Sequence, residues 1–357
     1  MERYIYWQIS KVIRSICLVR LSALGDVLMM VPLVRTLQDY FPEAKITWVI
    51  SRPAYDLVAE MEGIEFIVIP KPNSVMDYWR FKKLMKGRHF DVLLATQASF
   101  RANLLYGLIS ATRKIGYDAL RAKDGHGWFI HETIAPGRDH TLEGFLKFAE
   151  PLGVTTPVVR WDLPLSEEAL VFADEYLSRF KPPMVLINPA ASKPERSWNV
   201  ARYVAIIKHL QHRWNAHVIL TGGPSLFDRT LGKAITKEVL VHDLIGQTKP
   251  NQLLALIAQS DLLICPDTGP SHMAAAVGTP VIALHAVTSA QVSGPYTYRH
   301  LAVDYYPQAV ELILNKTWET MVWGTHAHGD KTMDLVCVES VIEMIDSVME
   351  GMNETSL

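Results

Sequence analysis

The sequence predicts an α/β protein made of two doubly wound, parallel-sheet domains. The chain has 357 residues, about twice the size of an ordinary domain of roughly 100–200 residues. Short apolar runs alternate with segments of helical periodicity, which is typical of parallel strands joined by helices. This alternation is interrupted by a proline-rich stretch over residues 151–183 and then begins again. We therefore expect one domain on each side of that stretch.

The first half of the chain contains four predicted strands. Each is an apolar run of five or six residues, the length typical of a buried strand in a parallel sheet. Between the first two runs, apolar residues recur at helical spacing from Val27 to Leu37, and Pro42 ends that helix. The predicted strands cover residues 15–20, 45–50, 65–69 and 91–95, and the helix covers residues 27–40.

The second half repeats this pattern. Ser166 is a suitable N-cap for a helix over residues 166–179, and a last amphipathic helix is predicted over 336–349. We expect an N-terminal domain over 1–165, a C-terminal domain over 166–335, and a tail over 336–357 that packs back across the domains. The remaining predicted strands are 184–187, 217–221, 262–265 and 281–284, and the remaining helices are 201–214, 251–260 and 271–277.

The charge composition excludes a strongly basic nucleic-acid-binding protein. Lys and Arg number 35 against 37 Asp and Glu, a net charge of −2. Residues 1–150 contain 20 of those cations and 16 of those anions, so the first half carries a basic excess. Such an imbalance favours an anionic partner for the first half.

The three cysteines, Cys17, Cys265 and Cys337, lie far apart in apolar runs and predict buried, reduced thiols. No apolar stretch reaches the ~18 residues of a membrane span. Charges at Glu2, Arg3 and Lys11 argue against a secretory signal. We therefore expect a cytoplasmic protein.

The loop over residues 20–26 follows the first predicted strand. Gly25 permits close approach to the backbone, and Asp26 stands at the start of the helix. Ligands bind beyond the carboxyl ends of strands in open parallel sheets, so Asp26 is a candidate functional carboxylate. The more common use of Asp at this position is as an N-terminal cap.

The loop over residues 188–198 carries a hydroxyl and two cations between a strand and a helix. Ser192, Lys193 and Arg196 could hold a phosphate by charge-assisted hydrogen bonds. The alternative is a solvated loop without a ligand.

The loop over residues 265–272 enters a helix directly from a buried strand. Amide groups at a helix N-terminus bind anions, which favours a phosphate near Thr268 and Gly269. Asp267 cannot bind a phosphate without a cation, so we expect it to order the loop or accept a hydrogen bond from a sugar hydroxyl. A capped helix after a tight turn would leave Asp267 and His272 unexplained.

Two further motifs are less specific. The turn Gly222-Gly223 follows a strand and could admit a nucleotide, whereas His326-Ala327-His328 is a possible metal pair without a third ligand in view. The sequence lacks G-x-G-x-x-G after its first strand, a G-x-x-x-x-G-K-[ST] loop and a G-x-S-x-G elbow. The absence of the first two motifs argues against a dinucleotide dehydrogenase and a P-loop enzyme.

Taken together, three segments resemble the ADP-heptose:lipopolysaccharide heptosyltransferases, glycosyltransferase family 9. They are residues 18–27, residues 188–192 up to Trp198, and residues 266–272 with 278–282. The resemblance runs from about residue 15 to the C-terminal helix. Three further features are similar to the heptosyltransferase I type. They are residues 114–118 with Arg121, residues 140–150, and the presence of both Ser192-Lys193 and Gly294-Pro295-Tyr296.

The resemblance implies a GT-B fold, in which two Rossmann-like domains face a cleft. The family's proposed general base matches Asp26, and we expect Ser22, Gly25 and Arg121 on the acceptor side. No metal and no cofactor are implied. The expected donor-binding residues are Ser192, Lys193, Arg196, Gly222, Gly223, Asp267, Thr268, Gly269 and His272. The chain departs from the family at Ala191-Ser192, at Arg196 where lysine is common, and in lacking an evident ribose-binding glutamate near residues 224–228.

The function implied is inverting transfer of heptose from ADP-heptose to a Kdo sugar of the lipid A-linked inner core. The acceptor would be met at the cytoplasmic face of the inner membrane of a Gram-negative bacterium, with no nucleic acid involved. Two alternatives are another GT-B enzyme, such as a sugar-nucleotide epimerase, and a non-catalytic sugar-nucleotide-binding protein. An epimerase needs a second acid or base, for which the sequence offers no clear candidate.

Residues 78–89 could contact that membrane, because they combine cations with aromatic residues. The alternative is a solvated helix face with the aromatic rings turned into the core. The residues concerned are Trp79, Phe81, Lys82, Lys83, Lys86 and Arg88.

Overall fold

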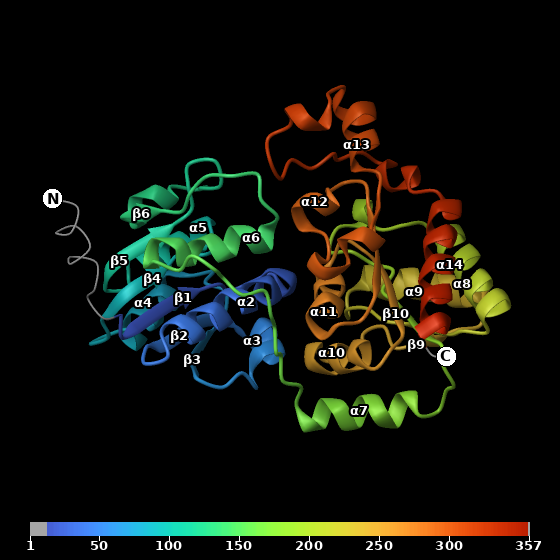
Figure 1. The fold of residues 1–357 in the computed structure, drawn as a ribbon, viewed down its shortest axis with the longest axis horizontal. Coiled ribbons are helices and arrows are strands. Elements are labelled where there is room, and N and C mark those ends of the chain that lie inside the picture. Colours follow the sequence, from blue (N-terminus) through green and yellow to red (C-terminus); the bar gives the residue numbers. More distant parts are fainter. Residues whose placement is uncertain (1–12, 356–357) are drawn as a thin grey trace. The chain divides into compact units, whose positions relative to one another are not determined.

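The computed structural model describes residues 13–355, and its chain divides into two compact units between Pro164 and Leu165 (Figure 1). Each unit contains a six-stranded, wholly parallel sheet, so the prediction of two doubly wound α/β units is confirmed. Glu2, Arg3 and Lys11, which bear on the secretory signal, lie outside the described residues. No helix of residues 13–355 has the length and apolar character needed to cross a membrane.

The first sheet has the order β3-β2-β1-β4-β5-β6. Its strands are β1 (Ser15–Val19), β2 (Lys45–Ser51), β3 (Ile64–Ile69), β4 (Phe90–Leu94), β5 (Ala111–Gly116) and β6 (Glu132–Thr133). The larger helices around it are α2 (Leu24–Tyr40), α3 (Arg52–Val58), α4 (Val75–Leu84), α5 (Phe100–Tyr106) and α6 (Thr141–Leu146). Strand β5 was not predicted, because Arg113 and Lys114 interrupt its apolar pattern.

The second sheet has the order β12-β11-β10-β7-β8-β9. Its strands are β7 (Met184–Ile187), β8 (His217–Leu220), β9 (His242–Asp243), β10 (Leu262–Pro266), β11 (Val281–His285) and β12 (Val303–Asp304). The larger helices are α7 (Glu167–Leu177), α8 (Val200–Trp214), α9 (Leu226–Glu238), α10 (Pro250–Ala258), α11 (Gly269–Val277) and α14 (Val338–Thr355). Helix α9 was not predicted.

Both sheets have the same strand order, and this order indicates where a ligand is expected. In each, the chain direction across the sheet reverses between the first and the fourth strand, which are β1 and β4 in one unit and β7 and β10 in the other. In open α/β sheets the crevice at the carboxyl ends of these strands is the usual ligand site. The predicted loops over residues 20–26, 188–198 and 265–272 follow β1, β7 and β10.

The C-terminal helix α14 packs against α8 in the second unit (Figure 1). Val341 and Ile345 are fully buried in the core there. Asp346 accepts hydrogen bonds from the Nε2 atom of His209 at 2.6 Å and from the indole of Trp214 at 2.7 Å. The burial of Val341 and Ile345 accounts for the regular apolar spacing of helix α14.

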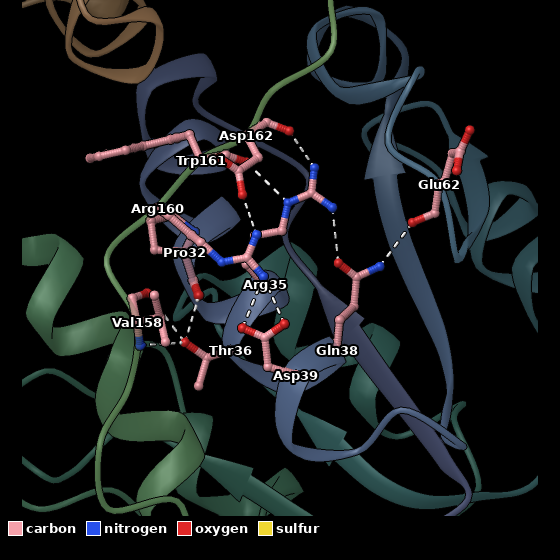
Figure 2. Close-up of polar contacts among 10 residues, drawn as sticks. All are labelled: Pro32, Arg35, Thr36, Gln38, Asp39, Glu62, Val158, Arg160, Trp161 and Asp162. Carbon is pink, nitrogen blue, oxygen red and sulfur yellow. Dashed lines mark hydrogen bonds and ion pairs between the residues drawn. The ribbon is translucent and has the colours of Figure 1, made fainter.

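The segment before the unit boundary is fastened to helix α2, as Figure 2 shows. Arg35 donates to the carbonyl of Trp161 at 3.0 Å, and Arg160 donates to both carboxylate oxygens of Asp39 at 2.7 and 2.9 Å. The backbone amide of Val158 donates to the hydroxyl of Thr36 at 3.0 Å. The segment thereby fixes the helix whose first turn contains Asp26.

Candidate functional site

The β1–α2 loop holds Asp26 in a defined position. Helix α2 begins after Ala23, so Asp26 is its third residue rather than its N-cap, and one carboxylate oxygen accepts the Ala23 amide at 3.0 Å. The same oxygen, Oδ2, pairs with the guanidinium of Arg20. Among residues 13–355 the other oxygen, Oδ1, has no hydrogen-bond partner, and the side chain is 27% exposed. Asp26 is thus a fixed carboxylate with one oxygen open to a ligand.

Arg20 is itself rigidly held. It donates to the carbonyl of Thr96 at 2.7 Å, and its guanidinium lies 5.2 Å from the ring centre of Phe145. Burial alone would lower the pKa of Arg20, but the Asp26 carboxylate and the Tyr117 hydroxyl raise it, and the net shift is upward. Arg20 is therefore a permanent cation beside Asp26.

A cavity of about 340 Å³ opens beside this loop at the carboxyl ends of β1, β3 and β4. Ser22, which was predicted on the acceptor side, lies in its wall. Lys71 and Arg101, which were not predicted, supply two cations, so the cavity suits an anionic ligand. The lining residues are Leu21, Ser22, Lys71, Pro72, Gln97, Ser99, Phe100 and Arg101.

The other two residues predicted on the acceptor side do not line this cavity. Gly25 is buried in the first turn of α2. Arg121 donates to the Asp118 carboxylate at 2.6 Å and to the carbonyl of Ala135 at 2.8 Å. In the first unit, Arg121 thus holds its own loop in place.

In the second unit, Asp267 organises the loop between β10 and α11. Its carboxylate accepts hydrogen bonds from Arg196 and Thr288, each at 2.6 Å, and from Ser293 at 3.2 Å. Burial alone would raise the pKa of Asp267, but the nearby His285, Arg196 and His272 lower it below its usual value. Asp267 is therefore an ionised, buried carboxylate that orders the loop, one of the two roles expected for it.

The N-terminus of α11 offers few free amides. The helix starts at Gly269 with Thr268 as N-cap, two residues earlier than predicted. Pro270 has no amide hydrogen, and the Ser271 amide donates to the Thr268 carbonyl at 3.1 Å. At most the amides of Thr268 and Gly269 are left for a ligand, with His272 buried in the same turn.

The β7–α8 loop separates the three residues predicted to act together on a phosphate. Ser192 and Lys193 are exposed, whereas Arg196 turns inward to Asp267. The Ala191 amide donates to the hydroxyl of Ser197 at 2.8 Å, which shapes the bend. The loop thus presents one hydroxyl and one ammonium group to solvent.

The glycine turn after β8 is held by Asp228, which was not singled out in the sequence. Its Oδ1 atom accepts the Gly223 amide at 2.8 Å. A Cβ atom on Gly222 would lie 3.0 Å from that oxygen, so a larger residue would displace it. Strand β8 pairs with β7, which pairs with β10. The turn at Gly222 and Gly223 therefore lies at the same edge of the sheet as the loops after β7 and β10.

Thr288 and Ser293, which both bind Asp267, were missed by the sequence reasoning. Both residues follow β11, which was predicted as a strand. The loop after this strand is therefore the feature of the sequence that could have indicated them. Among residues 13–355, no group of three His, Cys, Asp or Glu side chains has the geometry of a metal site.

Helix α4 covers much of the predicted basic segment, and two of its aromatic residues, Trp79 and Phe81, differ in exposure. Phe81 is buried, whereas Trp79 is 58% exposed with the Lys83 ammonium 5.7 Å from its ring centre. Val75 and Met76 are also exposed, at 86% and 52%. The exposed surface of α4 thus combines apolar side chains with cations.

Comparisons with known proteins show the family of this chain. The family model described as glycosyltransferase family 9 (heptosyltransferase) matches residues 78–311. The lipopolysaccharide core heptosyltransferase OpsX of Haemophilus influenzae is 33% identical over 337 residues, which cover 92% of this chain and 95% of OpsX.

Two solved structures share the fold. The glycosyl transferase family 9 structure from Veillonella parvula has a TM-score of 0.77 at 19% identity, covering 95% of this chain and 97% of that one. The Escherichia coli ADP-heptose lps heptosyltransferase II has a TM-score of 0.72 at 20% identity, covering 95% and 99%. The two-unit architecture is therefore the GT-B fold.

Proposed function

Because the chain belongs to glycosyltransferase family 9, the heptosyltransferases, we propose that it transfers heptose from ADP-heptose to a Kdo residue of the lipopolysaccharide inner core. The observation that carries this proposal is the carboxylate of Asp26, fixed by Arg20, in a loop whose residue Ser22 lines a cavity together with Lys71 and Arg101. Kdo is an acidic sugar, so its carboxylate suits two cations. The name of OpsX, a lipopolysaccharide core heptosyltransferase, supports the same acceptor class.

In the proposed reaction, a Kdo hydroxyl attacks the anomeric carbon of heptose with inversion. A bond forms between that oxygen and the anomeric carbon, the bond to the diphosphate oxygen breaks, and ADP leaves. Asp26 takes the hydroxyl proton, since its Oδ1 atom is open while Arg20 and the Ala23 amide hold Oδ2. Arg20 keeps the carboxylate oriented toward the acceptor.

The donor is held by the second unit. Ser192, Lys193 and the amides of Thr268 and Gly269 bind the diphosphate, and the turn at Gly222 and Gly223 admits the nucleotide. Arg196 and His272 act through Asp267, whose ionised carboxylate keeps the two loops together. The proposal includes no metal and no cofactor.

The acceptor is lipid-linked, so the enzyme must meet a membrane surface, which we place at the cytoplasmic face of the inner membrane. Helix α4 supports this contact, because Val75, Met76 and Trp79 are exposed on a helix that also carries Lys82 and Lys83. Residues of this kind bind anionic bilayers reversibly, with about 1 kcal/mol per cation near the surface. The loop between β3 and α4 also lines the acceptor cavity through Lys71 and Pro72.

The test is an incubation of the purified chain with Kdo-lipid A and a panel of ADP- and UDP-sugars, read by mass spectrometry. A gain of one heptose on Kdo-lipid A that occurs with ADP-heptose and with no other donor of the panel supports the proposal. A change of the nucleotide sugar without an acceptor product would indicate an epimerase. Donor binding without any product would indicate a sugar-nucleotide-binding protein.

A further inference from the structure

The segment carrying His326 and His328 is anchored beside the donor loops of the second unit. Between the two histidines, Ala327 is fully buried, and its amide donates to the Val287 carbonyl at 2.9 Å. Farther along, the indole of Trp198 donates to the Val336 carbonyl at 3.0 Å. Because Trp198 belongs to the β7–α8 loop, the histidine segment is fixed to that loop and to the end of β11.

His326 lies within electrostatic range of both Arg196 and Asp267, and His328 contacts the residue before Arg196. Val287 immediately precedes Thr288, which donates to the Asp267 carboxylate. The Nδ1 atom of His328 lies 3.6 Å from a carboxylate oxygen of Glu195, the residue before Arg196. The rings of His326 and His328 are 5.3 Å apart, centre to centre. Both residues are exposed in part, so their side chains can reach a ligand in solvent.

Partial burial and the cations around His326 favour its neutral form. Its pKa lies below the usual value, first because of partial burial and then because of nearby cations, against which Asp267 acts. An anion placed among these groups would reverse the balance and favour the protonated ring. The charged and titratable groups that face His326 are Arg196 and Lys193 from the β7–α8 loop, Asp267 from the β10–α11 loop, and His328 from its own segment, with Glu195 next to His328.

We propose that His326 and His328 bind the diphosphate of the nucleotide-sugar donor, and that His326 takes up a proton when the diphosphate binds. This rests on the proposed function, because it assumes an ADP-sugar at the second unit. A diphosphate carries two or more negative charges, and imidazolium is a strong hydrogen-bond donor to phosphate oxygen. With Lys193 and Ser192 exposed nearby, the two histidines complete a set of donors around one anion.

The experiment is calorimetric titration of the whole chain with ADP near pH 7, in two buffers of different ionisation enthalpy. The apparent binding enthalpy of the wild type should differ between buffers in the sense of proton uptake. His326→Gln should abolish this difference and weaken ADP binding by about tenfold or more, the loss typical of one charge-assisted hydrogen bond. Adenosine, which lacks phosphates, should bind the variant and the wild type equally.

His300→Gln is the matched control, because His300 is an exposed histidine of the same unit outside this cluster. It should keep both the affinity for ADP and the proton uptake. If the wild type binds ADP without proton uptake, or if His326→Gln binds ADP as the wild type does, the inference is wrong while the proposed function stands. If the wild type does not bind ADP, the proposed function fails and this inference fails with it.

Discussion

Arg196 donates from one terminal nitrogen to both the carboxylate and the backbone carbonyl of Asp267, at 2.6 Å each. The pair joins the loops after β7 and β10, the two strands between which the second sheet reverses direction. A cation that the sequence suggests for a phosphate is thus already engaged with an internal carboxylate. Lys193 and Ser192 remain exposed at the same loop for a ligand.

Removing the Arg196 side chain should destabilise the second unit as well as weaken donor binding. Arg196→Ala leaves the buried Asp267 carboxylate without its cation, a change that costs on the order of 3 kcal/mol. Urea denaturation measures this loss, and a double-mutant cycle with Asp267→Asn should recover part of it. Additive losses in the cycle would mean that the two side chains are not coupled.

The same second-unit residues should matter more for ADP than Asp26 does. Calorimetry should show that Arg196→Ala and His272→Ala each weaken ADP binding by about 1.5–3 kcal/mol relative to wild type. Asp26→Ala should weaken it less. The reason is that Arg196 and His272 both lower the pKa of Asp267, which joins the loops after β7 and β10. Unchanged ADP affinity in both variants would contradict the assignment of the donor site.

Asp26→Asn should reduce kcat by about 10²–10⁴-fold with little change in ADP affinity, because the amide cannot accept the acceptor proton. Asp77 provides a matched control, since it is likewise the third residue of a helix and accepts the amide of Ser74 at 3.1 Å. Asp77→Asn should keep normal turnover. Near-normal kcat in Asp26→Asn, with only a lowered melting temperature, would mean that Asp26 is a helix-capping residue.

The stability of the first unit should fall as the pH drops from about 6.5 toward 4. Burial lowers the pKa of His126 to about 4, and its Nε2 atom accepts the Tyr117 amide at 3.0 Å, which requires the neutral ring. The unfolded chain therefore takes up this proton at a higher pH than the folded chain. The stabilisation that depends on neutral His126 is fully present above about pH 6.5 and is lost as the pH falls. The loss near pH 4 should be on the order of 3 kcal/mol.

Urea denaturation at pH 7, 5.5 and 4.5 measures this dependence. His126→Gln should flatten it over this range, whereas His131→Gln, at an exposed histidine of the same unit, should not. An equal slope in wild type and His126→Gln would assign the pH dependence to other groups.

Binding to anionic vesicles should depend on helix α4. Lys82→Glu with Lys83→Glu should release the protein from phosphatidylglycerol vesicles, since each cation contributes about 1 kcal/mol near the surface. The matched control is Lys233→Glu with Lys237→Glu on helix α9, which makes the same charge change in the other unit. Sedimentation at low and high salt measures binding. Loss of binding in both double variants would indicate a general charge effect.

Strands that leave continuous apolar runs, and the loops that follow them, could be predicted from the sequence, whereas β5, which contains Arg113 and Lys114, could not. The predicted loops after β1, β7 and β10 are the loops that carry Asp26, Arg196 and Asp267. The fold class followed from the same alternation. Short edge strands such as β6 and β9 were not predicted, since two residues leave no periodicity.

The partners of these residues could not be predicted, because they come from distant parts of the chain. Arg196 and Asp267 are 71 positions apart, and nothing local in either loop indicates that they pair. Lys71 and Arg101, the two cations of the cavity in the first unit, follow different strands and come together only because those strands belong to one sheet. In helix α4, Trp79 and Phe81 are close in sequence, yet only the packing decides which one is exposed.

The central claim is that the acceptor is a Kdo sugar, and one paired reaction tests it. The chain is incubated with ADP-heptose and either Kdo-lipid A or lipid A without Kdo, and each product is weighed by mass spectrometry. We expect a gain of one heptose on Kdo-lipid A and no gain on lipid A alone. No gain on either acceptor, or an equal gain on both, would contradict it.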